Sequence, residues 1–298
     1  MDFLRRIFGI SSRTQERLTE SWEPQGSGRS GFKSEPTGPT AEPELSNTVP
    51  PSCVIENAAQ PPLRPRRLND FIGQHHIKNN LRVYIKASLK RGDPLDHVLL
   101  SGPSGFGKAT LAHVIANELG AQLRFTSAPE IKKTSDLAAL LTNLQEGDVL
   151  VIDEIHRLLP ALEEKLYPAM EDFSLDLLIG LGPSARSIKV ELPKFTLIGT
   201  TEQVGLMRQR FMKCFGISFR LRPYETEELQ VLIEQMGDEL GVVIGSGAAN
   251  IIARRAHGSP KAAKSLLRRI RDYAEVEFDG RITKEVVSEA LDHMIGTD

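Results

Sequence analysis

The sequence has few cysteines, no long apolar run and no excess of positive charge. Its two cysteines, Cys53 and Cys214, are too few for a disulfide framework or a multi-cysteine metal site, so a reducing, cytoplasmic setting fits best. No run of 18 apolar residues occurs, and the first residues lack the continuous apolar core of a signal peptide. We therefore expect a cytoplasmic protein with no membrane span.

The charges of the chain are balanced. Its 298 residues hold 37 Lys+Arg against 39 Asp+Glu, a formal net charge of -2. This balance excludes a protein that grips nucleic acid through a large basic field. A hydrophobic fraction of 40% and a charged fraction of 26% are typical of globular domains, and the length allows about two of them.

Composition divides the chain into three parts. The first 62 residues contain eight of the 18 prolines and little apolar periodicity, which predicts a disordered tail over residues 1–62. Over residues 63–221, short apolar runs alternate with helical periodicity, the pattern of an α/β core with a parallel sheet covered by helices. Residues 222–298 show only helical patterns and are expected to form an all-helical domain. The expected strands are 97–101, 123–127, 149–152, 195–200 and 217–221, and the expected helices are 68–90, 108–119, 136–144, 161–172, 207–213, 225–240, 246–257, 260–277 and 283–295.

The strongest local signal is a glycine-rich segment, Gly102-Pro-Ser-Gly-Phe-Gly-Lys108, between an expected strand and an expected helix. In such a loop, backbone N–H groups wrap phosphates, the helix N-terminus adds positive potential, and the lysine reaches the terminal phosphates. A plain strand-to-helix turn is the competing interpretation, which the order of strand, glycines, lysine and helix disfavours. The segment therefore predicts a phosphate-binding loop.

A second signal is the pair of acids Asp153 and Glu154, which follows an apolar strand. Ligands bind at the carboxyl ends of the strands in parallel sheets. Asp153 is therefore a candidate for holding magnesium, and Glu154 for orienting or deprotonating an attacking water. Two acids after a strand can also cap a helix, but their combination with the phosphate loop favours a nucleoside triphosphate site.

From about Leu63 to Ile295 the chain closely resembles the RuvB family, the AAA+ motors that drive Holliday junction branch migration with RuvA. The resemblance rests on the stretches LRPRRLNDFIGQ (63–74), LDHVLL (95–100), DEIHRL (153–158), LYPAMEDF (166–173), GPSARS (182–187) and LLRRIRDYAEV (266–276). It implies an AAA+ P-loop core followed by a helical lid, with ATP at their junction. It also implies a ring in which the nucleotide lies at the subunit interface.

The resemblance also implies site residues and partners. Arg64 and Tyr224 would contact the base and ribose side of the nucleotide, and Asp153 with Thr110 would hold Mg²⁺. Residues 175–192 alternate in two arms, which predicts a hairpin, and in RuvB the corresponding hairpin docks RuvA. RuvB continues past its lid into a winged-helix domain that grips DNA, so for a chain ending at Asp298 we expect DNA contact to be weak or indirect. The implied nucleotide-binding set is Leu63, Arg64, Gly102, Gly105, Gly107, Lys108, Ala109, Thr110, Glu171, Asp172, Phe173, Tyr224 and Lys261.

Four positions depart from the family's catalytic pattern. Ala109 stands where the loop needs a Ser or Thr hydroxyl for magnesium, although Thr110 keeps a hydroxyl nearby. Glu202 brings a carboxylate to a sensor position that is normally uncharged, where it repels the terminal phosphate unless it turns away or takes a proton. Cys214 matches the position of the arginine finger. Lys261 replaces an arginine and keeps the charge but loses the bidentate geometry.

One neighbour could replace the missing finger. If residues 207–213 are helical, Arg210 lies one turn before Cys214 on the same face, about 5.4 Å away. Each departure taken singly is compatible with harmless drift, whereas four around one phosphate indicate retained binding with weakened hydrolysis. Two hypotheses follow: a ring-forming motor subunit of Holliday junction branch migration with impaired hydrolysis, or a nucleotide-gated scaffold that docks RuvA or another RuvB subunit without translocating DNA.

Overall fold

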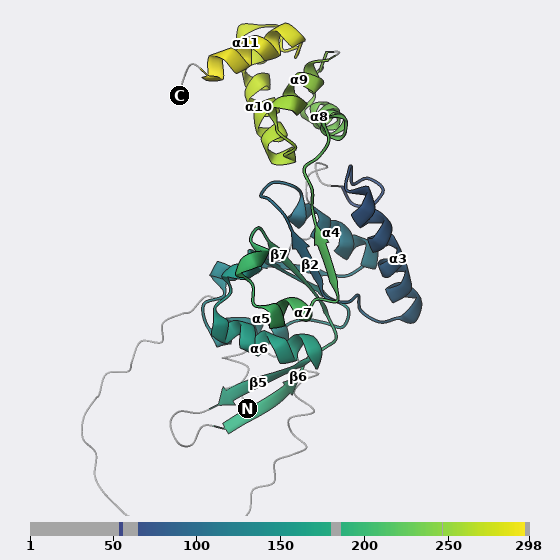
Figure 1. Ribbon diagram of the computed structural model, residues 1–298, viewed down its shortest axis with the longest axis vertical. Coiled ribbons are helices and arrows are strands. Elements are labelled where there is room, and N and C mark those ends of the chain that lie inside the picture. Colours follow the sequence, from purple (N-terminus) through teal and green to yellow (C-terminus); the bar gives the residue numbers. More distant parts are fainter. Residues whose placement is uncertain (1–53, 56–64, 180–185, 246, 296–298) are drawn as a thin grey trace, which may run out of the picture.

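The computed structural model describes residues 54–55, 65–179, 186–245 and 247–295 (Figure 1). The expectations for Leu63 and Arg64, for most of the tail, for the tip of the hairpin and for the last three residues lie outside the described residues. Within the tail, strand β1 (Val54–Ile55) pairs antiparallel with β3 (Leu123–Ser127). These two residues depart from the expectation of disorder, because the edge of β3 offers them backbone hydrogen-bond partners.

Within the described residues, the core contains a six-stranded sheet with the order β1-β3-β4-β7-β2-β8. All strands except β1 run parallel, which confirms the α/β core that the sequence predicts. Strand β7 lies between β2 and β4, so the residues that end β7 are placed between the loop after β2 and the acids after β4. The remaining bounds are Val98–Ser101 for β2, Val149–Asp153 for β4, Thr196–Thr201 for β7 and Ile217–Arg220 for β8.

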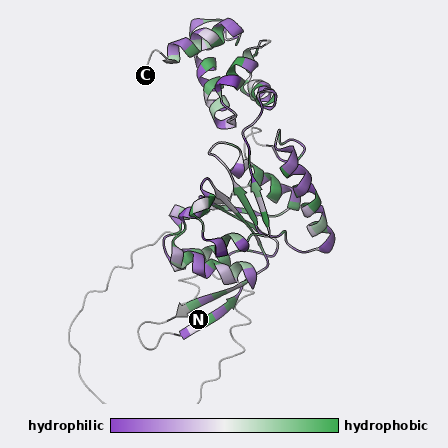
Figure 2. Cartoon of the chain, in the orientation of Figure 1, coloured by the Kyte–Doolittle hydropathy of each residue, from purple (hydrophilic) through white to green (hydrophobic). Residues whose placement is uncertain are grey.

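Helices bury both faces of this sheet. Alternate residues of β2 show the division, because Val98 and Leu100 pack in the cluster with α3 and α4, whereas Leu99 packs in the cluster with α5, α6 and α7. Such a period of two is what a strand with two buried faces requires. Figure 2 shows the strands of the core as a hydrophobic layer. The helix bounds are His75–Arg91 for α3, Lys108–Leu119 for α4, Thr134–Thr142 for α5, Pro160–Glu171 for α6 and Gln209–Lys213 for α7.

One expected helix was wrong at its start. The sequence predicts a helix from Leu68, but α3 begins at His75. Gly73 and Gln74 have left-handed backbones with φ of 73° and 49°, which separates the preceding turn from the helix. Leu68 is nevertheless buried, so its apolar character serves packing from a turn. The other expected elements lie within two residues of the observed bounds.

The lid is a separate helical unit after Pro223 (Figure 1). Its four helices have their own apolar core, in which Leu229, Ile252, Leu267 and Val287 are fully or almost fully buried. Ser259 caps α10 by accepting a hydrogen bond from the Ala262 N–H, and Pro260 follows at the first helical position. The bounds are Thr226–Leu240 for α8, Ala248–Arg255 for α9, Pro260–Glu277 for α10 and Lys284–Ile295 for α11.

Strands β5 (Ser174–Ile179) and β6 (Arg186–Glu191) form the expected hairpin. They pair antiparallel from Ser174 opposite Glu191 to Ile179 opposite Arg186. The hairpin lies at the end of the core away from the lid (Figure 1). Among the described residues, no helix combines the length and the apolar character that a membrane crossing requires.

The packing of Phe195 in the core leads to a prediction about the stability of the fold. Its ring is 0% exposed and packs against Phe173 at 5.9 Å between centroids, so Phe195→Ala leaves a cavity. We expect a loss of about 3–5 kcal/mol in the free energy of unfolding, measured by urea denaturation. Val83, which is 63% exposed on α3, supplies the control, and Val83→Ala should stay within about 0.5 kcal/mol of the parent. Equal losses in the two variants would contradict the packing described here.

Candidate functional site

The glycine-rich loop joins the end of β2 to the start of α4. The Gly102 N–H donates to the Thr201 carbonyl at 3.1 Å, which ties the start of the loop to the end of β7. Gly105 and Gly107 have φ of 78° and 90°, a region that glycine adopts readily and other residues rarely do. A Cβ at Gly105 would lie 2.6 Å from the Cβ of Lys261. The loop therefore needs glycine both for its backbone path and for the close approach of the lid.

The side chain of Lys108 folds back into this loop. It is 7% exposed, and its Nζ donates to the carbonyls of Gly102 at 2.8 Å and Pro103 at 3.0 Å. Glu202 Oε1 lies 3.7 Å from the same nitrogen. The sequence places Glu202 near a terminal phosphate, and in the structure it faces the lysine that would bind one. The ion pair itself was not foreseen, because it depends on β7 being the neighbour of β2.

Asp153 ends β4 and Glu154 follows it, and strand β7 lies between β4 and the strand β2 that leads into the phosphate loop. Asp153 accepts a hydrogen bond from the Thr200 hydroxyl of β7, and Glu154 has a left-handed backbone with φ of 54°. His156 joins this group, with Nε2 3.7 Å from Glu154 Oε2 and Nδ1 3.0 Å from the Thr201 hydroxyl. His156 was not a candidate from the sequence, although it lies within the stretch DEIHRL (153–158). A chain of contacts thus links the end of β7 to both acids.

The lid touches the phosphate loop directly. The Lys261 N–H at the start of α10 donates to the Gly105 carbonyl at 3.3 Å. The hydroxyl of Tyr224 lies 3.6 Å from where a Cβ on Gly107 would be. Burial, and then the nearby carboxylate of Glu228, raise the pKa of the Tyr224 phenol, so it stays protonated and able to donate a hydrogen bond.

The junction of the two domains is fixed by a reciprocal pair of hydrogen bonds. Gln74 Nε2 donates to the Arg222 carbonyl at 2.7 Å, and the Arg222 N–H donates to Gln74 Oε1 at 3.1 Å. The left-handed Gln74 that ends the turn before α3 thereby holds the connection to the lid. The sequence contains no sign of this contact, because the two residues are 148 positions apart.

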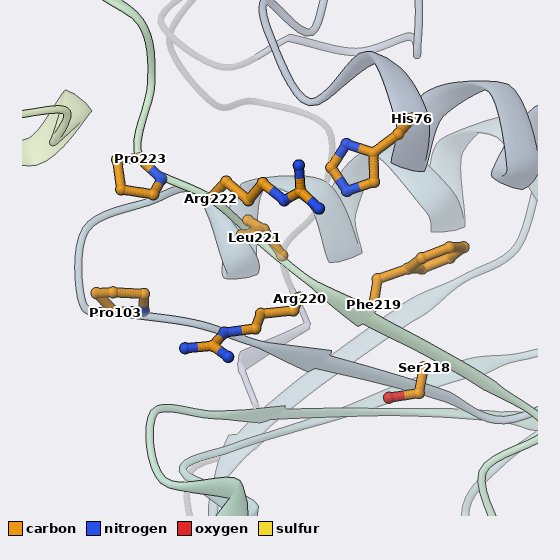
Figure 3. A pocket seen from close by; sticks show the side chains of 8 residues that line it. All are labelled: His76, Pro103, Ser218, Phe219, Arg220, Leu221, Arg222 and Pro223. Carbon is orange, nitrogen blue, oxygen red and sulfur yellow. The ribbon is translucent and has the colours of Figure 1, made fainter.

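Two cavities flank the loop. One of about 590 Å³ is lined by His76, Pro103 and residues 218–223, and in Figure 3 the Arg220 side chain extends toward Pro103 while Arg222 extends toward His76. The other, of about 710 Å³, is lined by residues 101–104, 202–205 and Arg220. Arg220 therefore borders both cavities, and it was not a candidate from the sequence.

The residues around the loop fit ATP and magnesium. The loop offers left-handed glycines, a buried lysine and the N-terminus of a twelve-residue helix, which together suit phosphates. Asp153 and the half-buried Thr110 offer oxygen ligands, and Ala109 offers none. No group of three or more His, Cys, Asp or Glu that could hold a metal occurs among the described residues. Magnesium commonly uses one or two carboxylates with phosphates and water, so this sparse donor set is compatible with it.

A second group of implied site residues lies elsewhere. Glu171 ends α6, and Asp172 and Phe173 follow it near the start of β2, where His97 Nε2 lies 3.0 Å from the Met170 carbonyl. The phosphate loop follows the opposite end of β2, and four strand residues rising about 3.3 Å each separate the two ends. The structure therefore does not bring these three residues to the phosphate loop of their own chain.

Cys214, which the family resemblance matches to the arginine finger, belongs to this second group. Cys214 Sγ lies 3.6 Å from Glu171 Oε1 and 3.5 Å from the Arg210 carbonyl. The Arg210 guanidinium lies over the Tyr167 ring, 4.8 Å from its centroid. Arg210 is thus one helical turn before Cys214, as the sequence predicts, and its side chain is engaged in a cation–π contact. The Cys214 thiol is therefore bordered by an acid.

Two family models match almost all of the described chain. The model described as the Holliday junction DNA helicase RuvB P-loop domain matches residues 63–221, and that described as the RuvB AAA lid domain matches residues 224–295. The two matches agree with the division between the sheet-containing core and the helical lid.

Individual relatives agree with the models. A Holliday junction branch migration complex subunit RuvB of Rubrobacter xylanophilus is 47% identical over 270 residues, which cover 91% of this chain and 75% of the relative. The protein of the same description from Campylobacter curvus is 54% identical over 237 residues, covering 80% and 70%. The solved structure of the Thermotoga maritima RuvB Holliday junction branch migration motor has a TM-score of 0.70 at 41% identity, covering 77% of this chain and 72% of that one.

The contact between Gly105 and the lid can be tested with a matched pair of variants. Gly105→Ala introduces a Cβ that collides with Lys261, so nucleotide affinity should fall by at least about tenfold, or about 1.4 kcal/mol. Gly92 has a similar φ of 71° but nothing within 4 Å of an added Cβ. Gly92→Ala therefore carries the same backbone strain and should keep the parental affinity, measured by isothermal titration calorimetry. Equal affinities for the two variants would show that the lid contact does not shape the site.

The carboxylate of Glu171 beside Cys214 leads to a prediction about how the reactivity of the thiol depends on pH. Burial, and then the Glu171 carboxylate, raise the pKa of the Cys214 thiol to about 11. In a Cys53→Ser background, alkylation of Cys214 by iodoacetamide should keep accelerating through about pH 10 instead of levelling near an ordinary thiol pKa of about 8.5. Glu171→Gln should lower that pKa and speed alkylation, because a carboxylate disfavours the thiolate. Glu164→Gln, on the same helix but directed to Arg208, is the control and should change nothing.

Proposed function

The chain belongs to the RuvB family, and from this premise we propose that it is an ATP-binding AAA+ ring subunit of Holliday junction branch migration whose hydrolysis is impaired. The proposal rests on a difference between the residues expected to bind phosphate and the position expected to supply the arginine finger. The phosphate-binding side keeps Lys108, Asp153 and Glu154, while the finger position at Cys214 carries no charge. We propose a cytoplasmic role in DNA recombination and repair.

The binding function follows from the loop and the lid. Lys108 would neutralise phosphate charge, and the Lys261 N–H and the Tyr224 hydroxyl would close the site from the lid side. Asp153 and Thr110 would hold magnesium, which when bound supplies charge neutralisation of the phosphates. Glu154, held near His156, would orient and deprotonate a water.

Impaired hydrolysis follows from the departures at this site. Ala109 removes a hydroxyl ligand for the metal, and Glu202 adds a negative charge at 3.7 Å from the Lys108 nitrogen. Cys214 removes a charge that contributes about 10³ to 10⁵ in rate in other nucleotide hydrolases. Lys261 keeps a charge without the fork of an arginine. The changes at Ala109 and Cys214 act mainly on a step after binding, whereas Glu202 and Lys261 also concern groups that contact phosphate.

A ring is supported by the distance between the two groups of residues. Glu171, Asp172, Phe173 and Cys214 lie at the amino ends of the strands, away from the phosphate loop of their own chain. If they act on a nucleotide, it must be one held by a neighbouring subunit, as the family's arrangement implies. The Cys214 position then lies at a subunit interface, where Arg210 or Lys213 could partly replace the lost charge.

The hairpin at 175–192 is proposed to dock a RuvA-like protein. It projects from the core at the end away from the lid, which leaves the lid and the phosphate loop uncovered (Figure 1). Ile188 is 39% exposed on β6 and offers an apolar contact. Direct contact between this chain and DNA is proposed to be weak or indirect, because a formal net charge of -2 gives the chain no overall positive charge to attract DNA phosphates.

A second candidate is a nucleotide-gated scaffold that docks RuvA or another RuvB subunit without moving DNA. It is favoured by the surroundings of Cys214, whose thiol lies 3.6 Å from the acid Glu171. A motor and a scaffold both require nucleotide binding that Lys108→Ala removes. They differ in whether the remaining residues can support turnover.

The test is to restore the missing groups. Cys214→Arg combined with Ala109→Thr should raise ATP turnover by up to about 10³, with little change in ATP affinity, because an arginine beside Glu171 would be held at the finger position. Gln209→Arg combined with Ala109→Thr adds the same charge elsewhere on α7 and should not raise turnover to that extent. Glu154→Gln in the restored chain should abolish turnover.

The outcomes separate the candidates. A restored chain that turns over, together with a nearly inactive parent, supports a weakened motor. A restored chain that binds ATP and still does not turn over supports the scaffold. A parent that hydrolyses ATP as fast as the restored chain contradicts impaired hydrolysis in either form.

A further inference from the structure

The ammonium of Lys108 has three donors, and the structure shows how they are directed. Two are taken by the carbonyls of Gly102 at 2.8 Å and Pro103 at 3.0 Å. The carboxylate of Glu202 lies at ion-pair distance, 3.7 Å from the same nitrogen. Because the lysine is only 7% exposed, water and other anions have little access to its ammonium group.

The main chain around Glu202 is anchored on one side. Thr201, the last residue of β7, is 0% exposed, and its hydroxyl accepts a hydrogen bond from the Gln203 N–H at 3.1 Å. A short turn, Val204–Leu206, follows. The backbone of Glu202 is therefore held beside the phosphate loop, and its carboxylate stays within reach of Lys108.

No second cation compensates Glu202 in the described part of the chain. Lys108 is the one basic group there with a salt bridge to it. Arg220 borders the same cavity of about 710 Å³ and extends toward Pro103 in Figure 3, but no ion pair joins it to Glu202 in the described residues. An anion that binds Lys108 must therefore share this lysine with Glu202 or displace the carboxylate.

The number of phosphates in the ligand determines how strongly it competes with Glu202 for Lys108. In phosphate loops of this kind the backbone N–H groups hold the α- and β-phosphates, and the lysine reaches the β- and γ-phosphates. A triphosphate carries one more charged group than a diphosphate, and that group is directed to the lysine. Like charges at such short distances repel strongly in a partly buried site.

We propose that Glu202 gives this site a preference for a nucleoside diphosphate over the corresponding triphosphate, by occupying the side of Lys108 that an outermost phosphate would need. The inference rests on the proposed function, since it concerns the same nucleotide site. It makes the departure at Glu202 a determinant of ligand choice as well as a defect in hydrolysis. The resting state of a subunit would then be the diphosphate-bound one.

The experiment compares two ligands on the full chain by isothermal titration calorimetry in the presence of Mg²⁺. The ligands are ADP and adenylyl imidodiphosphate, a triphosphate analogue that is not turned over. The parent should bind ADP more tightly. Glu202→Gln keeps the size of the side chain and removes its charge, so affinity for the triphosphate analogue should rise by about tenfold, with ADP affinity changed by less than about twofold.

Two controls make the result specific. Glu146→Gln removes another exposed carboxylate, from the loop before β4 at the other end of the sheet, and should leave the ratio of the two affinities unchanged. Lys108→Ala should abolish binding of both ligands. ADP binding by Glu202→Gln also shows that the variant is folded.

The outcomes distinguish this inference from the proposed function. Equal affinities of the parent for both ligands, or an unchanged ratio in Glu202→Gln, overturn the diphosphate preference while leaving nucleotide binding intact. Absence of binding of either ligand to the parent overturns both. A raised triphosphate affinity in Glu202→Gln alone, with Glu146→Gln like the parent, supports the proposal.

Discussion

The position of β7 between β2 and β4 is the constraint on which the rest of the site depends. The phosphate loop follows β2 and the acids follow β4, so whatever ends β7 lies between them. Thr200 donates to Asp153, the Thr201 hydroxyl contacts His156, and Glu202 faces Lys108. Three consecutive residues thereby connect the two halves of a nucleotide site. A change of charge at the end of β7 therefore acts directly on the electrostatic environment of Lys108.

The two ends of the sheet divide the functions of the chain. The carboxyl ends carry the loop, the acids and the contact with the lid, where the Lys261 N–H meets the Gly105 carbonyl. The amino ends carry Glu171 and Cys214, which the length of β2 keeps away from that loop. The proposed roles of these two groups require that one subunit meets another. The departures from the family's pattern occur at both ends of the sheet. Ala109 and Glu202 lie at the carboxyl ends of the strands, and Cys214 lies at the amino ends.

The sequence predicted the motifs and the order of the elements better than the contacts between them. The five parallel strands are short apolar runs, and Lys108 and Asp153 stand in recognisable patterns, so they could be found without a structure. The start of α3 could not, because Leu68 packs from a turn that the left-handed Gln74 ends. Strand β1 is two residues in a proline-rich segment and gives no periodic signal.

The contacts that were missed depend on residues far apart in the chain. The ion pair of Lys108 with Glu202 requires β7 to neighbour β2, and the backbone contact of Lys261 with Gly105 requires the lid to close on the loop. Neither the strand order nor the lid position follows from periodicity. Sequence could therefore identify which residues depart from the family's pattern, whereas their physical effects needed the fold.

We propose that this chain keeps nucleotide binding while its hydrolysis of ATP is impaired. The most direct measurement is nucleotide occupancy and ATP turnover on the same sample of the unmodified chain, with and without RuvA and junction DNA. The account predicts saturable, Lys108-dependent binding with turnover close to background in every condition. Turnover at an ordinary AAA+ rate by the unmodified chain alone would contradict it.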